Sequence, residues 1–551
     1  MTSVPEAEAG DSVFLPERAA VTVSVATIVA TVMLFHISAL NGWWLADDPQ
    51  ILLQARHSSL RQIFFSPHHW RVLSSSNFTP LVTLSFKVDL ALFGLDARWF
   101  FAHQLIALAL AATLLFFLVR RYAGILIGTI AAVLFVISPQ AILLSRFLML
   151  RHYLEGLCFA LAALLVWDGR PWKRWAALVA ALLYLAALCA KEVYAPLPIL
   201  FLVMSLRRGD RPRQIVRDLI PAAAVAVVYI VWRGWMLGSA GGYGGISVAA
   251  LSRLPMVVAS AAFGHQRWEI VIVLCVALAL LIESLLAAPK RGAVLLIGTA
   301  VMVMLPLIPV AAQFENRYAL VAFVSLLVLG ACAAASAPWR VARYLYALLF
   351  FPLLAGGQNQ RVTAEGQSQL MIGEGRYVSE RPASSPTLLA QSPGWYLEGL
   401  TDLRREMKGE SAPSILLSVY PLYLAGNHEG VVQCIADCRE VAPISDALRE
   451  EGARKGKGFR SDLPMRVRIE KKGDDFYWDL APNDGGWVFL SFPDYDEFPI
   501  PASGWRRLPE NEGRQLFRIF HENGDGLWAI TPPLEVPAPG HRLVWQNGSL
   551  R

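Results

Sequence analysis

The sequence predicts a polytopic α-helical membrane protein of about eleven spans, followed by a C-terminal extracytoplasmic α+β domain. Three observations support this fold class. Of the 551 residues, 55% are hydrophobic and only 17% are charged, whereas a soluble domain has about 25% charged residues. Apolar runs long enough to cross a bilayer recur as far as residue 356. After Gly357, charged residues, Gly and Pro return, and the apolar runs shorten to the length of strands.

A spanning helix needs about 20 mostly apolar residues. The segments that approach this length are residues 20–40, 99–119, 122–138, 152–168, 172–190, 193–206, 217–237, 268–288, 292–313, 317–336 and 340–356. Residues 251–263 are also apolar and are expected to lie at the membrane surface or to be partly inserted. The first run lacks a small-residue cleavage site, so it is expected to be an uncleaved span rather than a signal peptide.

Clusters of Arg and Lys follow the even-numbered spans. They lie at residues 120–121, 170–174, 207–217, 290–291 and 340–343. Because basic loops tend to stay in the cytoplasm, we predict a cytoplasmic tail (1–18), a transmembrane domain (19–357) and an extracytoplasmic soluble domain (358–551). The net charge is +6, and the basic residues are spread over these loops. We therefore interpret them as topology signals beside membrane lipids, and not as a nucleic-acid binding surface.

The predicted outer domain has the pattern of a mixed α and β fold. Three segments alternate in hydrophobicity between turn residues and are predicted strands, at residues 487–492, 515–520 and 526–531, with helices expected near 402–407 and 445–454. Cys434 and Cys438 would lie in an oxidising compartment that permits a disulfide, although a helix at this spacing would strain the bond. The sequence leaves both states open.

An acidic pair follows the first span. Asp47 and Asp48 come directly after Trp43 and Trp44, and such aromatic residues mark the membrane interface. Adjacent carboxylates repel each other, so one of them can titrate at high pH and act as a base. The other interpretation is a solvated turn in which an Asp caps a helix that begins at Pro49.

Other predicted outer segments also place polar groups near the membrane. These groups are His103, Arg146, Arg151, His152, Glu155, Lys191, Glu192, Glu315, Arg317 and Tyr318. Ionisable residues at this depth are costly and tend to face a cavity, although any one of them could be a snorkelling helix end or a structural ion pair. Because all of these groups are predicted on the same side of the membrane, we favour a shared cavity. The cations in this cavity would suit a phosphate-linked substrate.

Three weaker features complete the predicted outer face. Residues 58–65 have the pattern of a capped amphipathic helix that lies on the membrane. His68 and His69 are adjacent, and adjacent side chains seldom share one ion, so we predict no metal site there. The glycine-rich residues 241–245 form either a mobile gate or a plain linker.

Several motifs, in this order, resemble the C-type glycosyltransferases (GT-C), and most closely those of the protein O-mannosyltransferase type. They are Asp47-Asp48, Pro80-Leu81, Leu92-Phe93-Gly94-Leu95, Trp99 to Gln104, Ser138-Pro139 with Arg146 and Arg151-His152, Ala190-Lys191-Glu192 and Glu315-Asn316-Arg317-Tyr318. The resemblance covers about residues 20–340. Thr79 stands where members often have Arg, and Arg151-His152-Tyr153 stands where many have Arg-Lys-Asp, so acceptor or sugar contacts are expected to differ.

The resemblance implies an inverting glycosyltransferase that uses a polyprenyl-phosphate-linked sugar at the outer face of a bacterial inner membrane. Asp47 or Asp48 would be the general base, and Arg317, Lys191 or Arg151 would stabilise the lipid phosphate. The acceptor would be a hydroxyl of a protein, lipid or glycan. No cofactor is required, although a divalent metal occurs in some relatives. The alternatives are a transporter or flippase, which should show inverted repeats that are not found in this sequence, and a non-catalytic scaffold.

Overall fold

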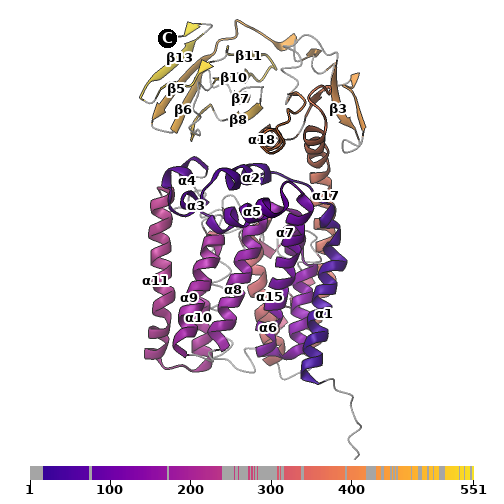
Figure 1. The fold of residues 1–551 in the computed structure, drawn as a ribbon, viewed down its shortest axis with the longest axis vertical. Helices are drawn as coiled ribbons and strands as arrows, with labels where there is room; N and C mark the ends of the chain where they lie inside the picture. Colours follow the sequence, from indigo (N-terminus) through magenta and orange to yellow (C-terminus); the bar gives the residue numbers. More distant parts are fainter. Residues whose placement is uncertain are drawn as a thin grey trace, which may run out of the picture.

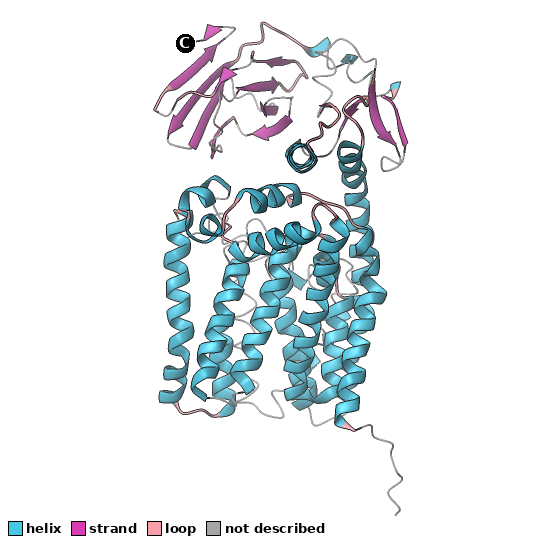
Figure 2. Cartoon of the chain, in the orientation of Figure 1, coloured by secondary structure: helices cyan, strands magenta, loops and turns pink. Residues whose placement is uncertain are grey.

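The computed structural model describes residues 16–73, 77–169, 173–238, 315–336 and 341–390 and most of 392–550; between 239 and 314 it describes only scattered positions. The chain builds three layers (Figures 1 and 2). A bundle of long helices forms one end, short helices cross the top of the bundle, and β-sheets form the other end. The predicted fold class is therefore confirmed: an integral membrane protein with a C-terminal domain of mixed α and β structure.

The long helices share apolar sequence and pack on one another through a single hydrophobic core. They are α1 (Glu17–His36), α6 (Ala97–Ile137), α7 (Pro139–Arg146), α8 (Arg151–Gly169), α9 (Lys173–Ala190), α10 (Leu197–Arg208), α11 (Pro212–Leu237), α15 (Leu320–Ser336) and α16 (Val341–Leu348). Among the described residues, five helical segments are long and apolar enough to cross a membrane, and two shorter apolar helices accompany them. Most residues of the predicted spans 268–288 and 292–313 lie outside the described residues.

Helix α6 is two helices joined at Gly124, whose backbone is left-handed in φ (81°). A residue with a Cβ atom rarely adopts this conformation, so glycine permits the reversal. A Cβ atom on Gly128 would lie 3.1 Å from the Phe116 carbonyl oxygen, which shows that the chain folds back on itself there. The two predicted spans 99–119 and 122–138 correspond to these two arms.

The short helices of the middle layer belong to the segment between α1 and α6. They are α2 (Asp48–His57), α3 (Leu60–Phe65), α4 (Pro67–Leu73) and α5 (Pro80–Phe93), followed further along by η2 (Leu148–Leu150), η3 (Glu192–Tyr194) and η5 (Asn316–Ala319). The predicted cap of α3 is confirmed, because Ser59 and Gln62 exchange the hydrogen bonds of a capping box. Figure 1 shows this layer between the bundle and the C-terminal domain.

Helix α17 (Phe350–Glu380) leaves the bundle and continues into the C-terminal domain (Figure 1). The sequence-based boundary at residues 357 and 358 falls inside this helix. Beyond it, α18 (Gly394–Lys408) contains the helix predicted at 402–407. Buried residues of α17 and α18 share one hydrophobic cluster with α2, α5 and the start of α6, so the C-terminal domain and the middle layer are packed together.

The C-terminal strands form three sheets. The first contains β1 (Thr387–Leu389), β2 (Ile415–Leu416), β3 (Val431–Ile435) and β4 (Glu440–Pro443) in the order β2-β1-β3-β4. The second contains β7 (Trp487–Phe492), β8 (Asp496–Ile500), β10 (Leu516–Glu522), β11 (Trp528–Ile530) and β12 (Leu534–Glu535). The third contains β5 (Arg466–Lys472), β6 (Asp475–Ala481), β9 (Ser503–Arg507), β13 (Arg542–Gln546) and β14 (Ser549–Leu550).

The three predicted strands are confirmed as β7, β10 and β11. Trp478, Trp528 and Trp545 are buried in the apolar clusters of this domain. Cys434 on β3 is disulfide-bonded, while its predicted partner Cys438 and the glycine-rich residues 241–245 lie outside the described residues. Half of the helix expected at 445–454 is described, and residues 446, 450, 453 and 454 of it are helical.

Candidate active site

The acidic pair lies in a turn, residues 42–48, that joins the end of the first span to α2. Ala46 has a positive φ of 47°, and it is the one non-glycine residue of the described chain with that sign. Asp47 precedes α2, Asp48 opens it, and Pro49 occupies its first turn. The two neighbouring carboxylates of this turn have different surroundings. Asp47 is exposed, whereas Asp48 is wholly buried.

Asp47 faces a cavity of about 290 Å³. The cavity is lined by Asp47, Gln50, Ile51, Gln54, Trp70, Asn77, Thr79, Val82, Thr83, Met149, His152, Tyr153, Lys191, Arg317 and Tyr318. These residues come from α2 and the turn before it, α4, α5 and the loop before it, η2, α8, the loop before η3 and the η5 turn, and several of these elements are far apart in the sequence. The cavity is close to the lower end of the size range of small-molecule sites, about 300 Å³.

Two cations line this cavity on the side of α8, η3 and η5. The Lys191 ammonium donates to the Asn77 side-chain oxygen at 2.7 Å and pairs with Glu192 at 3.1 Å. The Arg317 guanidinium pairs with Glu315 at 2.8 Å. The predicted groups Lys191, Arg317, Tyr318, His152 and Asp47 therefore meet at one cavity, and Glu192 and Glu315 hold its two cations.

The wall formed by α2 and α5 carries neutral polar side chains. Gln50 and Gln54 are one helical turn apart on α2, and Thr79 and Thr83 lie at the start of α5. Sequence reasoning did not single out these side chains or Asn77 as site residues. The available signal was the spacing of four residues in each pair, which puts both members on one face of a helix.

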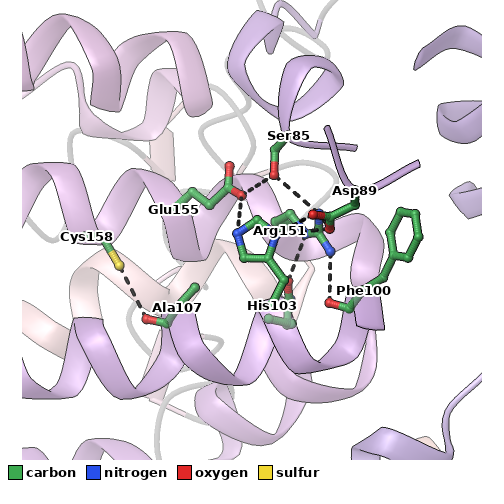
Figure 3. A network of polar contacts seen from close by, with 9 residues as sticks. Ser85, Asp89, Phe100, His103, Ala107, Arg151, Glu155 and Cys158 are labelled. Carbon is green, nitrogen blue, oxygen red and sulfur yellow. Dashed lines mark hydrogen bonds and ion pairs between the residues drawn. The ribbon is translucent and has the colours of Figure 1, made fainter. Parts of the chain in front are cut away.

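Arg151 and His103 lie in a separate buried network beside the cavity (Figure 3). Arg151 is fully buried, pairs with Asp89 at 2.6 Å and donates to the Phe100 carbonyl at 2.9 Å. His103 Nδ1 lies 2.9 Å from Asp89, and its Nε2 lies 3.8 Å from Glu155. This network ties α5, α6 and α8 together, and neither predicted residue lines the cavity.

Arg146 is also outside the cavity lining. It ends α7, pairs with Glu365 of α17 at 2.7 Å and donates to the Ser38 hydroxyl at 2.8 Å. These contacts connect the first span, α7 and α17, so Arg146 joins helices and does not line the cavity.

The two carboxylates differ in acidity as well as in exposure. Burial raises the pKa of Asp48 to about 8; the hydrogen bond from the Leu45 backbone N–H at 2.8 Å opposes the rise, and the charge of Asp47 adds to it. Burial also raises the pKa of Asp47, while the Arg317 charge opposes this shift. At neutral pH, Asp48 is therefore mainly protonated, and Asp47 is the acid that the cavity can reach.

Within the described part of the chain, no three His, Cys, Asp or Glu side chains are grouped so as to hold a metal ion. His69 Nε2 lies 2.7 Å from the Ser58 hydroxyl, a contact that fixes the start of the segment between α2 and α3. The arrangement at the cavity thus offers one ionisable carboxylate, two cations and a neutral polar wall as its chemical groups.

No family model and no curated protein matches the sequence. Among solved structures, the chain is similar to ArnT from Cupriavidus metallidurans bound to undecaprenyl phosphate, with 12% identity, a TM-score of 0.43 and coverage of 76% of this chain and 94% of that one. It is also similar to the Archaeoglobus fulgidus oligosaccharyltransferase in complex with Zn and sulfate, with 13% identity, a TM-score of 0.42 and coverage of 71% and 61%. The chain thus spans about three fifths of the Archaeoglobus enzyme. Likenesses of this extent assign no activity.

Proposed function

We propose that the protein is an inverting glycosyltransferase that moves a sugar from a polyprenyl-phosphate carrier to an acceptor hydroxyl. The observation that supports this proposal most strongly is the composition of the cavity. One exposed carboxylate, Asp47, shares it with Lys191 and Arg317. A base for a hydroxyl and cations for a phosphate are the two kinds of group that such a transfer requires.

In the proposed reaction, Asp47 accepts the proton of the acceptor hydroxyl as its oxygen attacks the anomeric carbon. The new glycosidic bond forms on the face opposite the phosphate, so the configuration of the anomeric carbon inverts. The bond between that carbon and the phosphate oxygen breaks, and its electron pair leaves with the polyprenyl phosphate. Lys191 and Arg317 stabilise the charge that develops on this leaving group.

The neutral wall of α2 and α5 gives the sugar or the acceptor a place to bind. Amide and hydroxyl side chains such as Gln54 and Thr83 can donate to and accept from sugar hydroxyls. We place this site on the extracytoplasmic face of a bacterial inner membrane, following the basic loops of the sequence. The acceptor is a hydroxyl of a protein, lipid or glycan, and none of the proposed steps requires a metal.

Transfer from a radiolabelled polyprenyl-phosphate sugar, measured in membranes that contain the full chain, tests the proposal. We expect Asp47→Asn to lower the rate by about 100- to 10,000-fold, which is the usual contribution of a general base. Asp96→Asn is the matched control, because Asp96 is an exposed helix cap outside the cavity. Transfer that is equally fast in both variants would overturn the assignment of Asp47.

The same preparation distinguishes the proposed enzyme from the two alternative functions, a transporter or flippase and a non-catalytic scaffold. An enzyme yields a labelled acceptor together with free polyprenyl phosphate. A transporter or flippase instead moves the labelled lipid across reconstituted vesicles without breaking the sugar–phosphate bond, and a scaffold does neither. If the labelled donor stays intact in membranes that contain the folded protein and an acceptor, the result contradicts the proposed reaction.

A further inference from the structure

The turn that presents Asp47 is held from the C-terminal part of the chain. The Ala46 backbone N–H donates to the Met371 sulfur of α17 at 3.2 Å. The Tyr396 hydroxyl of α18 lies 2.9 Å from the Trp44 carbonyl oxygen and 3.0 Å from that of Met371, so its single proton serves one of these carbonyls or is shared by both. The contact of Ala46 with Met371 and that of Trp44 with Tyr396 each join residues more than 300 positions apart in the sequence.

The packing around these contacts is close. A Cβ atom on Gly399 of α18 would lie 2.8 Å from the Pro49 side chain, directly behind the acidic pair. About two turns further along each helix, Glu406 pairs with Arg56 at 3.2 Å and with His57 at 2.8 Å. Helix α18 therefore contacts α2 at both its first and its last turn, and Figure 1 shows α18 above α2.

The backbone conformation of the turn indicates that these contacts constrain its shape. A positive φ is unfavourable for a residue with a Cβ atom, such as Ala46. Strain of this kind persists only where the surroundings enforce it. Trp44 and Tyr396 are buried, and a buried carbonyl without a hydrogen bond is costly. The contacts from α17 and α18 therefore fall on the backbone positions that determine where Asp47 points.

We propose that α17 and α18 act as a positioning element for the base, with Tyr396 as the central positioning residue. This inference rests on the proposed function, because it gives the C-terminal domain a task in the same reaction. Tyr396 does not line the cavity, so its effect must reach the reaction through the direction of Asp47. We therefore expect the C-terminal domain to be required for turnover, and none of its described residues lines the cavity.

Tyr396→Phe tests this inference, because it removes the hydroxyl and keeps the ring. Tyr377→Phe is the matched control, since the Tyr377 hydroxyl also donates to a backbone carbonyl of the C-terminal domain, that of Pro386 at 2.8 Å, without contacting the acidic turn. Hydrogen–deuterium exchange of residues 42–57 in the full chain reports on the turn without requiring catalysis. We expect faster exchange there in Tyr396→Phe than in Tyr377→Phe, and equal exchange would overturn the inference.

Kinetics provide the second measurement. We expect Tyr396→Phe to lower kcat by about five- to ten-fold, which corresponds to one lost hydrogen bond, with an unchanged KM for the polyprenyl-phosphate sugar. Faster exchange with an unchanged kcat would refute the positioning role. If the wild type shows no transfer, the proposed function fails, while the exchange experiment still decides whether the turn is held by Tyr396.

A second pair of variants covers the case in which Tyr396→Phe does not fold. A Cβ atom on Gly375 would lie 2.1 Å from the Tyr396 hydroxyl oxygen, so Gly375→Ala displaces the hydroxyl while the tyrosine stays in place. Gly366→Ala on the same helix is its control, because nothing lies within 4 Å of the added atom. We expect faster exchange of the turn and a lower kcat only in Gly375→Ala.

Discussion

Asp48→Asn separates the roles of the two adjacent acids. Asp48 is wholly buried, and burial raises its pKa to about 8. At pH 7 the side chain is therefore mainly neutral, and an asparagine replaces it with little change in shape or charge. The asparagine oxygen can still accept the hydrogen bond from the Leu45 N–H. We expect Asp48→Asn to retain transfer within about ten-fold of the wild type, whereas Asp47→Asn loses about 100-fold or more.

The stability of the wild type relative to this variant should depend on pH. In the unfolded chain Asp48 titrates at its ordinary value of 3.8, and in the folded chain at about 8. Between these values the folded state holds more protons, so the free energy of unfolding of the wild type falls as the pH rises. One pKa unit corresponds to about 1.4 kcal/mol, so the loss between pH 5 and pH 8 has an upper limit of about 4 kcal/mol.

Asparagine does not titrate, so the stability of Asp48→Asn relative to the wild type should grow over this range. The assay is the unfolding midpoint in detergent, measured for both proteins between pH 5 and pH 9 beside Asp96→Asn as the exposed control. A difference that stays constant with pH would refute the burial of a protonated Asp48. A loss of transfer as large as that of Asp47→Asn would refute its exclusion from the chemistry.

Two further predictions follow from the cavity and the network beside it. Lys191→Gln should raise KM for the donor by about 10- to 100-fold, the equivalent of one charge-assisted hydrogen bond, with a smaller effect at high salt, and steady-state kinetics at two ionic strengths measure it. Arg151→Met should lower the free energy of unfolding by about 3–5 kcal/mol because it leaves the buried Asp89 carboxylate without the guanidinium charge, with His103 still beside it. The double variant with Asp89→Asn should recover part of that loss in a denaturation assay.

Much of the fold follows from local sequence. Span positions follow from runs of apolar residues, the cap of α3 from Ser59 and Gln62, and the strands from alternation, because each of these signals lies within one element. The grouping of Asp47, Lys191 and Arg317 was predicted from their common side of the membrane, and the structure brings them to one cavity.

Other parts of the site depend on contacts between segments that are far apart in the sequence. Arg151 and Lys191 look alike in the sequence, since each opens an apolar run near the same face. Only the packing of α5 against α8 puts Arg151 on Asp89, while the loop before η3 leaves Lys191 at the cavity. The hydrogen bonds that α17 and α18 make with Ala46 and Trp44, beside the acidic pair, likewise join segments that are far apart in the sequence.

The burial of Asp48 also bears on how Asp47 can work as a base. An ionised carboxylate on the adjacent residue would raise the pKa of Asp47 further and disfavour the form that accepts a proton. A neutral Asp48 removes that repulsion at neutral pH, and Arg317 lowers the pKa of Asp47 from the other side of the cavity. In the proposed reaction, two features of the turn therefore favour Asp47 as the base. The contacts of α17 and α18 with Ala46 and Trp44 would fix its direction, and the neutral Asp48 beside it adds no repelling charge.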